Sequence, residues 1–418
     1  MLNVFMNKKH FIIAFILITA LLFFNNLLHD MYVKMVSTPT NVQTVVNNEQ
    51  ISSQKLFDRT WKTVKKSYYD KDMNEQDWYR WKVHYQGKIK TEDDAYVAIN
   101  TMLASLNDPY TKFLSKKEFE DLNTSIDSKI TGIGVNILSN AGKIIVLNVI
   151  DGTPASSSGI KSGDIIYAVN KKEVSGMTVS DVASLVRGPE NSTVELTLLR
   201  KDKKINKTIK RKEIKIKTVK SSVDKNIGYI QILSFIGATT SNEFIEALEK
   251  TNKTDGLILD LRGNPGGLLP NAIFIANLFI PEGKIVSVVG RNGFKQDLTA
   301  QQTNYNVDKP LIVLIDHSSA SASEILSGAL KDYKKAKLVG TTTYGKGMVQ
   351  QVMPMPNATG LNLTIAKYLT PNGTDINKKG IAPDINVELT IDDLKKNKDV
   401  QLDIAKKMMT DILKAENN

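Results

Sequence analysis

Two polar residues lie in surroundings that suit catalysis: Ser321, within a serine-rich stretch, and Lys346, between two glycines. The stretch S-S-A-S-A-S-E is followed by apolar residues at helical spacing from Ile325 to Leu330, so Ser321 is predicted at the start of a helix. Lys346 is predicted on the next strand. A serine hydroxyl and a lysine amine that meet in space can act as nucleophile and general base.

A lysine acts as a base only when it is neutral. Its reference pKa of about 10.4 must therefore fall to roughly 7, which requires a desolvation effect of about 4–5 kcal/mol. The flanking Gly345 and Gly347 allow backbone to pack closely around the amine of Lys346. Nearly all of the 55 Lys and Arg side chains must be solvated, and only the preceding serine-rich helix start distinguishes this lysine from the others.

The sequence gives little support to a histidine base, a cysteine nucleophile or a zinc-dependent mechanism. His317 is the one histidine near Ser321 in the sequence, and we expect it to point past the serine rather than toward it. The chain has no cysteine, which excludes thiol nucleophiles and thiolate metal sites, and it has no H-E-x-x-H pattern for zinc. We therefore expect neither a metal nor a cofactor.

The predicted helix start also suits the binding of a developing negative charge. The first N–H groups of a helix have no partner within it. Together with the helix dipole, they can stabilise the oxyanion of acyl transfer. Ala322, which follows Ser321, offers one such N–H group. The alternative is that serines in this turn are ordinary N-caps, which we favour for Ser318, Ser319 or Ser323.

A glycine-rich turn upstream offers a second backbone donor. The apolar segment Gly256–Asp260 is followed by the turn G-N-P-G-G and by helical spacing from Leu268 to Leu278, which predicts a strand-turn-helix unit of a parallel sheet. A phosphate-binding loop would need a lysine and a hydroxyl, which this turn lacks. We expect Gly266 or Gly267 to supply a second oxyanion amide.

The motifs D-L-R-G-N-P-G-G, S-A-S-A-S-E-I and Y-G-K-G-x-V-Q, in this order, resemble those of the carboxyl-terminal processing proteases, the tail-specific serine peptidases. The resemblance covers roughly residues 55–415. It implies that Ser321 is the nucleophile, that Lys346 is the base and that Gln350 orients the amine. Residues 346 and 350 share one side of an extended strand, which fits that role.

Residues 118–215 resemble a PDZ domain, with short β-rich runs, a small helical turn from Pro154 to Gly159 and a helix from Val179 to Val186. In PDZ domains a peptide adds as a strand, and its terminal carboxylate enters a nest of backbone amides. The resemblance assigns this nest to the loop of Gly132, Ile133 and Gly134. The alternative interpretation is that these residues form a plain glycine turn at the start of a strand.

The turn R-G-P-E-N-S-T begins at Arg187, and in some family members an arginine here helps to couple the PDZ domain to the active site. The resemblance therefore implies a regulatory role for Arg187, with an ordinary surface arginine as the alternative. Asn191 and Ser192 stand where a glycine is usual. The turn remains feasible because asparagine tolerates a left-handed backbone.

The N-terminus predicts export. Lys8 and Lys9 precede an uncharged apolar run from Phe11 to Phe24, so residues 1–30 are predicted as an uncleaved signal anchor, with a cleaved signal as the alternative. Residues 31–53 are predicted as a linker. The basic end favours a single-pass cell-membrane protein whose remainder lies outside the cytoplasm, on the periplasmic or cell-wall side.

The net charge of +11 raises the question of nucleic-acid binding. The only dense basic run, Lys201–Lys220, has no interleaved aromatic residues, so we expect no nucleic-acid partner. A solvated basic face, or attraction to anionic lipid or cell-wall polymer, explains the charge better.

The predicted architecture is multidomain, with mixed α/β and β parts. A helical N-terminal region (54–117) and the PDZ-like module precede an α/β protease core (216–390) and a C-terminal helix (391–418), which packs on the core or on a second subunit of a homodimer. The predicted function is that of a serine endopeptidase acting on protein substrates with a free C-terminus. A non-catalytic PDZ scaffold and a basic polymer-binding protein are the alternatives.

Overall fold

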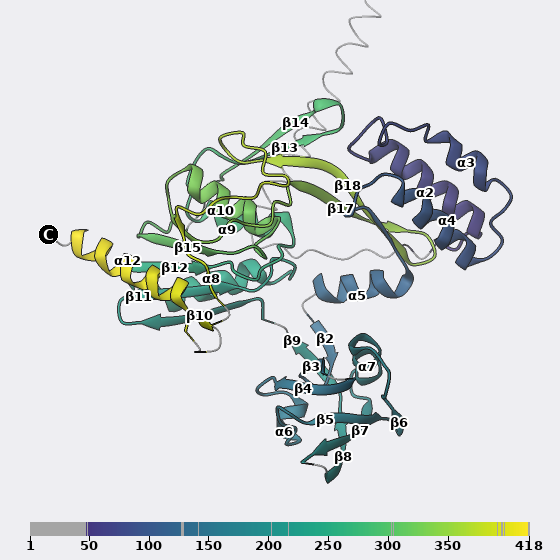
Figure 1. Ribbon diagram of the computed structural model, residues 1–418, viewed down its shortest axis with the longest axis horizontal. Coiled ribbons are helices and arrows are strands. Elements are labelled where there is room, and N and C mark those ends of the chain that lie inside the picture. The colour runs from purple at the N-terminus through teal and green to yellow at the C-terminus, as the bar shows by residue number, and fades with distance from the viewer. Residues whose placement is uncertain are drawn as a thin grey trace, which may run out of the picture. The chain divides into compact units, whose positions relative to one another are not determined.

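The computed structural model describes residue 47 and residues 49–416, except 127–128, 141, 202, 216, 302, 304, 391, 394–395 and 397. The described chain forms two compact units. One contains the residues up to Asp121 and those from Thr218 onward, and the other is Leu122–Lys217. The chain therefore leaves the first unit, forms the second and returns to complete the first (Figure 1).

The first unit is built on a six-stranded sheet of order β10-β11-β12-β15-β16-β19. Its strands are β10 (Val219–Asp224), β11 (Ile227–Ile232), β12 (Gly256–Asp260), β15 (Leu311–Ile315), β16 (Lys337–Gly340) and β19 (Ile385–Asn386). All pairs from β11 onward are parallel, and β10 is antiparallel to β11. Every residue of β12 and β15 is buried, as in a parallel sheet covered on both faces.

Helices cover both faces of this sheet (Figure 1). Leu257 and Leu259 of β12 contact the helices of one face, whereas Ile258 contacts the helix on the other, because successive side chains of a strand point to opposite faces. The first face carries α8 (Thr240–Lys250), α9 (Leu269–Asn277) and α10 (Ala322–Asp332), and the second carries α12 (Val400–Glu416). The predicted strand-turn-helix unit and the predicted C-terminal helix are confirmed.

A second, antiparallel sheet of the first unit has the order β1-β18-β13-β14, and β17 also pairs with β18. Its strands are β1 (Lys112–Leu114), β13 (Lys284–Gly290), β14 (Lys295–Thr299), β17 (Met348–Met355) and β18 (Thr359–Leu369), with a 3-10 turn at Arg291–Gly293. β18 is thus the central strand, and it joins the N-terminal region to the segment after Lys346.

The N-terminal region is helical, as predicted, with α2 (Ser53–Ser67), α3 (Tyr79–Tyr85), α4 (Glu92–Ala104) and α5 (Lys116–Ile126). Trp61 and Trp78 are buried, and each indole N–H donates to the backbone carbonyl of the other tryptophan. Their hydrophobic core includes Leu361 and Leu363 of β18, so the helices pack directly on the second sheet.

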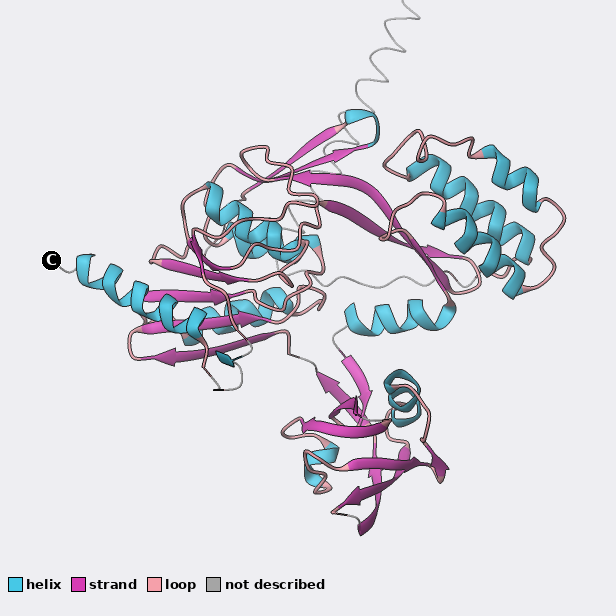
Figure 2. Cartoon of the chain, in the orientation of Figure 1, coloured by secondary structure: helices cyan, strands magenta, loops and turns pink. Residues whose placement is uncertain are grey.

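The second unit is mostly strand (Figure 2). Its elements are β2 (Lys129–Gly132), β3 (Val135–Asn140), β4 (Lys143–Val149), α6 (Pro154–Ser157), β5 (Ile165–Val169), β6 (Lys172–Glu173), α7 (Val179–Val186), β7 (Thr193–Arg200), β8 (Lys203–Lys210) and β9 (Lys212–Lys215). Both predicted helices are present. Asn191 has φ 67°, which confirms that it adopts the left-handed conformation expected of it.

The predicted signal anchor, residues 1–30, lies outside the described residues. Among the residues that the structure does describe, none of the helices combines the length and the apolar character needed to span a bilayer.

Candidate active site

The two glycine- and serine-rich motifs meet because they leave neighbouring parallel strands at the same edge of the sheet. The turn 261–267 follows β12, and the stretch 316–321 follows β15. Asp316 joins them, since its carboxylate accepts the backbone N–H of Gly263 at 3.0 Å and that of Ser318 at 2.9 Å. Ligands in open parallel sheets bind outside this carboxyl edge.

Ser321 is the N-cap residue of α10, in agreement with the predicted helix start. Its backbone has φ 54° and ψ −112°. A positive φ is uncommon for a residue with a side chain, and such strained conformations cost about 1–3 kcal/mol and cluster at functional sites. The neighbouring serines are structural: the Ser319 hydroxyl donates to the Leu261 carbonyl at 2.8 Å, and the Ser323 hydroxyl to that of Asn264 at 3.0 Å.

Glu324 links the serine to the lysine, and sequence reasoning gave it no role. One carboxylate oxygen, Oε2, accepts the backbone N–H of Ser321 at 2.8 Å and that of Lys346 at 2.9 Å. The other, Oε1, accepts from the Thr343 hydroxyl at 2.6 Å and from the Gly345 N–H at 2.7 Å. The side chain is fully buried. The spacing S-x-x-E, typical of a capping box, was the available signal.

Tyr368 of β18 makes a second link. Its hydroxyl lies 3.1 Å from the carbonyl oxygen of Ser321 and 2.7 Å from that of Lys346. Burial and the nearby Glu324 raise the pKa of this phenol well above its usual value, so it stays protonated and can donate. Sequence reasoning gave Tyr368 no role in the site.

Lys346 lies in the loop between β16 and β17, so its placement on a strand was wrong. The loop conformation depends on Gly345, which has φ 86° and leaves no room for a Cβ beside residues 378–380. Burial lowers the pKa of Lys346, helped by Lys112 and opposed by Asp108 and Glu324. The side chain is half-buried, and its Nζ lies 4.8 Å from the centroid of the Tyr110 ring.

Gln350 lies in β17, and its amide Nε2 donates to the Thr364 hydroxyl at 3.4 Å. The argument that residues 346 and 350 share one side of a strand does not hold, because Lys346 precedes the first strand residue, Met348. The role of Gln350 as the residue that orients the amine of Lys346 remains a prediction.

The predicted oxyanion donors Ala322, Gly266 and Gly267 are not equivalent. An added Cβ on Gly266 would lie 2.9 Å from the Ser321 Cβ and 3.0 Å from the Ala322 N, so this turn touches the nucleophile loop. However, the Gly266 N–H donates to Asn264 Oδ1 at 2.9 Å. Ala322 is the first residue of α10, where N–H groups lack partners within the helix. Ala322 and Gly267 therefore remain as candidates, and a Cβ added to Gly267 would meet the backbone of Phe235 and Ile236.

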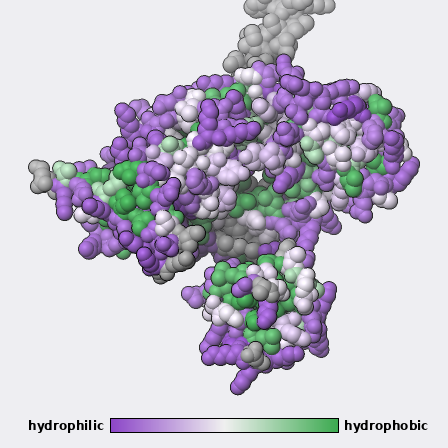
Figure 3. Space-filling model, in the orientation of Figure 1, coloured by the Kyte–Doolittle hydropathy of each residue, from purple (hydrophilic) through white to green (hydrophobic). Residues whose placement is uncertain are grey.

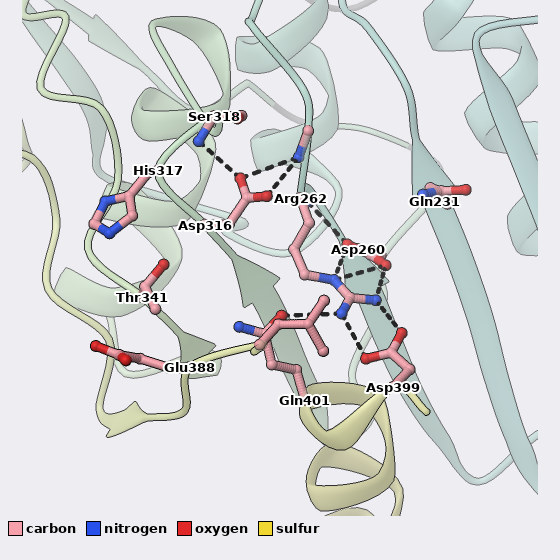
Figure 4. Close-up of a pocket in the computed structure, with 12 residues that line it drawn as sticks. Gln231, Asp260, Arg262, Asp316, His317, Ser318, Thr341, Glu388, Asp399 and Gln401 are labelled. Carbon is pink, nitrogen blue, oxygen red and sulfur yellow. Dashed lines mark hydrogen bonds and ion pairs between the residues drawn. The ribbon is translucent and has the colours of Figure 1, made fainter. Parts of the chain in front are cut away.

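His317 is exposed and lines a cavity of about 740 Å³ beyond the glycine-rich turn (Figure 4). Ser321 is not among the lining residues. In this cavity Arg262 binds Asp260 at 2.6 Å and Asp399 at 2.7 Å, so the turn is tied to the segment that leads into α12.

The predicted peptide-binding residues belong to the second unit. Ile133 is buried and its carbonyl accepts the Ala155 N–H at 2.7 Å, while Gly134 has φ 89° and packs against Thr153. The next strand, β3, is an edge strand of its sheet, as addition of a peptide strand requires. Arg187 is the C-cap residue of α7.

The fold and the arrangement of Ser321 at a helix start define a serine peptidase core combined with a PDZ domain. Residues 226–387 match peptidase family S41, residues 145–200 match the PDZ domain, and residues 52–104 match the tricorn protease C1 domain. The chain belongs to the carboxyl-terminal processing proteases of peptidase family S41, and it is a serine-type peptidase.

Individual relatives support this assignment. The chain is 34% identical over 372 residues to the carboxyl-terminal-processing protease of Synechocystis, covering 85% of this chain and 87% of the relative. It is 41% identical over 307 residues to carboxy-terminal processing protease CtpA of Bacillus subtilis, covering 72% and 66%. The solved photosystem II D1 C-terminal processing protease is similar, with 31% identity, a TM-score of 0.55, and 81% and 94% of the two chains covered.

Proposed function

We propose that this peptidase is an exported, membrane-anchored endopeptidase that grips the free C-terminus of a protein substrate through its PDZ domain and cleaves with a Ser321–Lys346 dyad. The observation that carries the proposal is the connection between the two residues. Glu324 binds the backbone of both, and burial lowers the pKa of Lys346, as a general base requires.

In the proposed reaction, neutral Lys346 takes the hydroxyl proton of Ser321 while the serine oxygen attacks the scissile carbonyl. The N–H groups of Ala322 and Gly267 stabilise the resulting oxyanion. Lys346 then gives its proton to the leaving amine, and an acyl-enzyme remains. Lys346 then takes a proton from the water that attacks this ester and returns it to the Ser321 oxygen as the new carboxyl terminus leaves. Gln350 orients the amine.

Substrate selection is proposed to rest on the PDZ domain. A C-terminal peptide would pair with the edge strand β3, and its carboxylate would bind N–H groups of Gly132, the last residue of β2, and of Ile133 and Gly134, which follow it. The left-handed backbone of Gly134 supports this, because a nest of backbone N–H groups contains a residue in that conformation. Arg187 is proposed to couple this binding to the active site.

Two further properties complete the proposal. Residues 1–30 anchor the chain in the cell membrane with the peptidase outside the cytoplasm. The chain also forms a homodimer through α12, where hydrophobic residues gather at the surface (Figure 3); Leu402, Ile404 and Met408 are partly exposed there. Light scattering of the detergent-solubilised chain would reject the dimer if it gives the mass of a monomer.

The test of the dyad uses the full chain in detergent and an unstructured polypeptide with a free apolar C-terminus. We expect Ser321→Ala and Lys346→Ala to abolish cleavage, while the exposed Ser318→Ala and Lys379→Ala leave it intact. Amidation of the substrate C-terminus should slow cleavage if the carboxylate is bound. Cleavage that survives Ser321→Ala would reject the mechanism, and binding without cleavage by the unmutated chain would favour the scaffold.

A further inference from the structure

The side chain of Lys346 contacts a residue from the N-terminal helical region. Its Nζ lies 4.8 Å from the centroid of the Tyr110 ring. Tyr110 belongs to the turn between α4 and β1, far from Lys346 in the sequence. An ammonium group within about 6 Å of an aromatic centroid is attracted by the negative face of the ring. A neutral amine gains no such attraction, so the ring favours the protonated form of Lys346.

The Tyr110 ring is held on a fixed backbone. The Tyr110 N–H donates to Asp108 Oδ1 at 2.9 Å, and the Tyr110 carbonyl accepts from Asn362 Nδ2 at 3.1 Å. Directly afterwards, Lys112 of β1 pairs with Asn362 of β18. The turn is therefore joined to the same strand whose Tyr368 binds the backbone of Ser321 and Lys346.

The same turn also reaches Gln350. The Thr111 hydroxyl donates to Asp108 Oδ2 at 2.6 Å and accepts the backbone N–H of Thr364 at 3.1 Å. Thr364 in turn accepts from Gln350 Nε2 at 3.4 Å. Two adjacent residues of the N-terminal region, Tyr110 and Thr111, thus connect to the proposed base and to the residue proposed to orient it.

The charges around Lys346 oppose one another. Asp108 and Glu324 favour the ammonium form, whereas burial and Lys112 favour the neutral amine, and their net effect lowers the pKa. Burial raises the pKa of the Tyr110 phenol most, and the nearby phenol of Tyr344 raises it further. The Tyr110 ring therefore remains an uncharged phenol next to the lysine.

Building on the proposed Ser–Lys mechanism, we propose that Tyr110 is a positioning residue that holds the ammonium of Lys346 on its ring in the resting enzyme. When the ammonium loses its proton to water, the attraction to the ring is lost and the neutral amine is free to accept the proton of Ser321. The N-terminal region thereby sets the protonation and position of the base.

The test measures the pKa of Lys346 directly. The full chain in detergent is labelled with a trace of acetic anhydride across a pH series, and mass spectrometry of the Lys346 peptide gives the fraction of neutral amine at each pH. We expect Tyr110→Leu, which removes the aromatic face, to lower this pKa by roughly 0.4–1.5 units. The acid limb of kcat/KM should move down by the same amount. Tyr110→Phe, which keeps the ring, should change neither.

A second variant keeps the shape of the side chain. If Tyr110→Leu does not fold, trifluorophenylalanine at position 110 weakens the negative face of the ring without changing its size, and it should lower the pKa of Lys346 relative to Tyr110→Phe. An unchanged pKa in both the leucine and the fluorinated variant would overturn the proposal. Labelling is repeated in the Ser321→Ala background, so that this result stands whether or not the proposed dyad catalyses cleavage.

Discussion

The carboxylate of Glu324, in the first turn of α10, accepts the backbone N–H of Lys346 at 2.9 Å, although Lys346 lies in the separate loop between β16 and β17. The same oxygen accepts the N–H of Ser321 at 2.8 Å. Glu324 therefore fixes the distance between the two loops while leaving the hydroxyl and the amine free to react. At both positions it binds the main chain and so positions the two residues, while its charge favours the ammonium form of Lys346.

Replacing this carboxylate by an amide should uncouple the two loops. Glu324→Gln puts an NH2 group where one oxygen now accepts two hydrogen bonds, so N–H groups would face a donor. We expect a loss of about 1–3 kcal/mol in the free energy of unfolding and a tenfold or larger fall in kcat/KM for an unstructured polypeptide. The exposed Glu388→Gln is the control. Equal kcat/KM in the two variants would contradict the role assigned to Glu324.

The pH dependence of activity should report the titration of Lys346. Burial, helped by Lys112, lowers its pKa below the usual value of 10.5. Because only the neutral amine is a base, kcat/KM should rise with pH and level off above the pKa of the folded enzyme. Removing the positive neighbour in Lys112→Gln should raise this pKa and move the rising limb to higher pH. A limb that stays in place, measured by initial rates in a constant-ionic-strength buffer series, would argue against Lys346 as the base.

The fold could be predicted from the sequence wherever local patterns determine it. The buried strand Gly256–Asp260, the helix after Ser321 and the helix Val179–Val186 all follow from hydrophobic period and flanking turns. The contacts of the site could not be predicted in this way. Tyr110 reaches Lys346 only because β1 pairs with β18, and this pairing joins segments far apart in the chain.

The hydrogen-bond partners and conformations of individual backbone groups also could not be predicted from the sequence. The sequence predicted an oxyanion donor at Gly266 or Gly267 without distinguishing them, and the N–H of Gly266 donates to Asn264 Oδ1 in an Asx turn. The position of Lys346 before β17, rather than on it, depends on the left-handed backbone of Gly345. Such details depend on turn geometry, which hydrophobic periodicity does not encode.

The close approach of the glycine-rich turn to the nucleophile predicts that Gly266 tolerates no side chain. A Cβ there would lie 2.6 Å from the Ala320 carbonyl oxygen and 2.9 Å from the Ser321 Cβ, so Gly266→Ala should displace Ser321 and reduce kcat/KM at least tenfold. Gly263→Ala is a matched control, because Gly263 also has a positive φ but an added Cβ meets no atom within 4 Å. Similar activity in the two variants would mean that backbone strain, and not contact with Ser321, is responsible.

The buried ion pair of Arg262 should matter more for stability than an exposed one. Arg262 is 14% exposed and its partner Asp260 only 1%, whereas Arg59 and Glu49 form a pair in which each side chain is nearly half exposed. Arg262→Met leaves Asp260 buried without its cation, and we expect a loss of about 3–5 kcal/mol in the free energy of unfolding. Arg59→Met should cost about 0–1 kcal/mol. Scanning calorimetry of the full chain compares the two variants.

Because Arg262 also binds Asp399, its loss should expose the C-terminal helix to early proteolysis. Equal melting temperatures for the two variants would show that the Arg262 cluster does not stabilise the first unit.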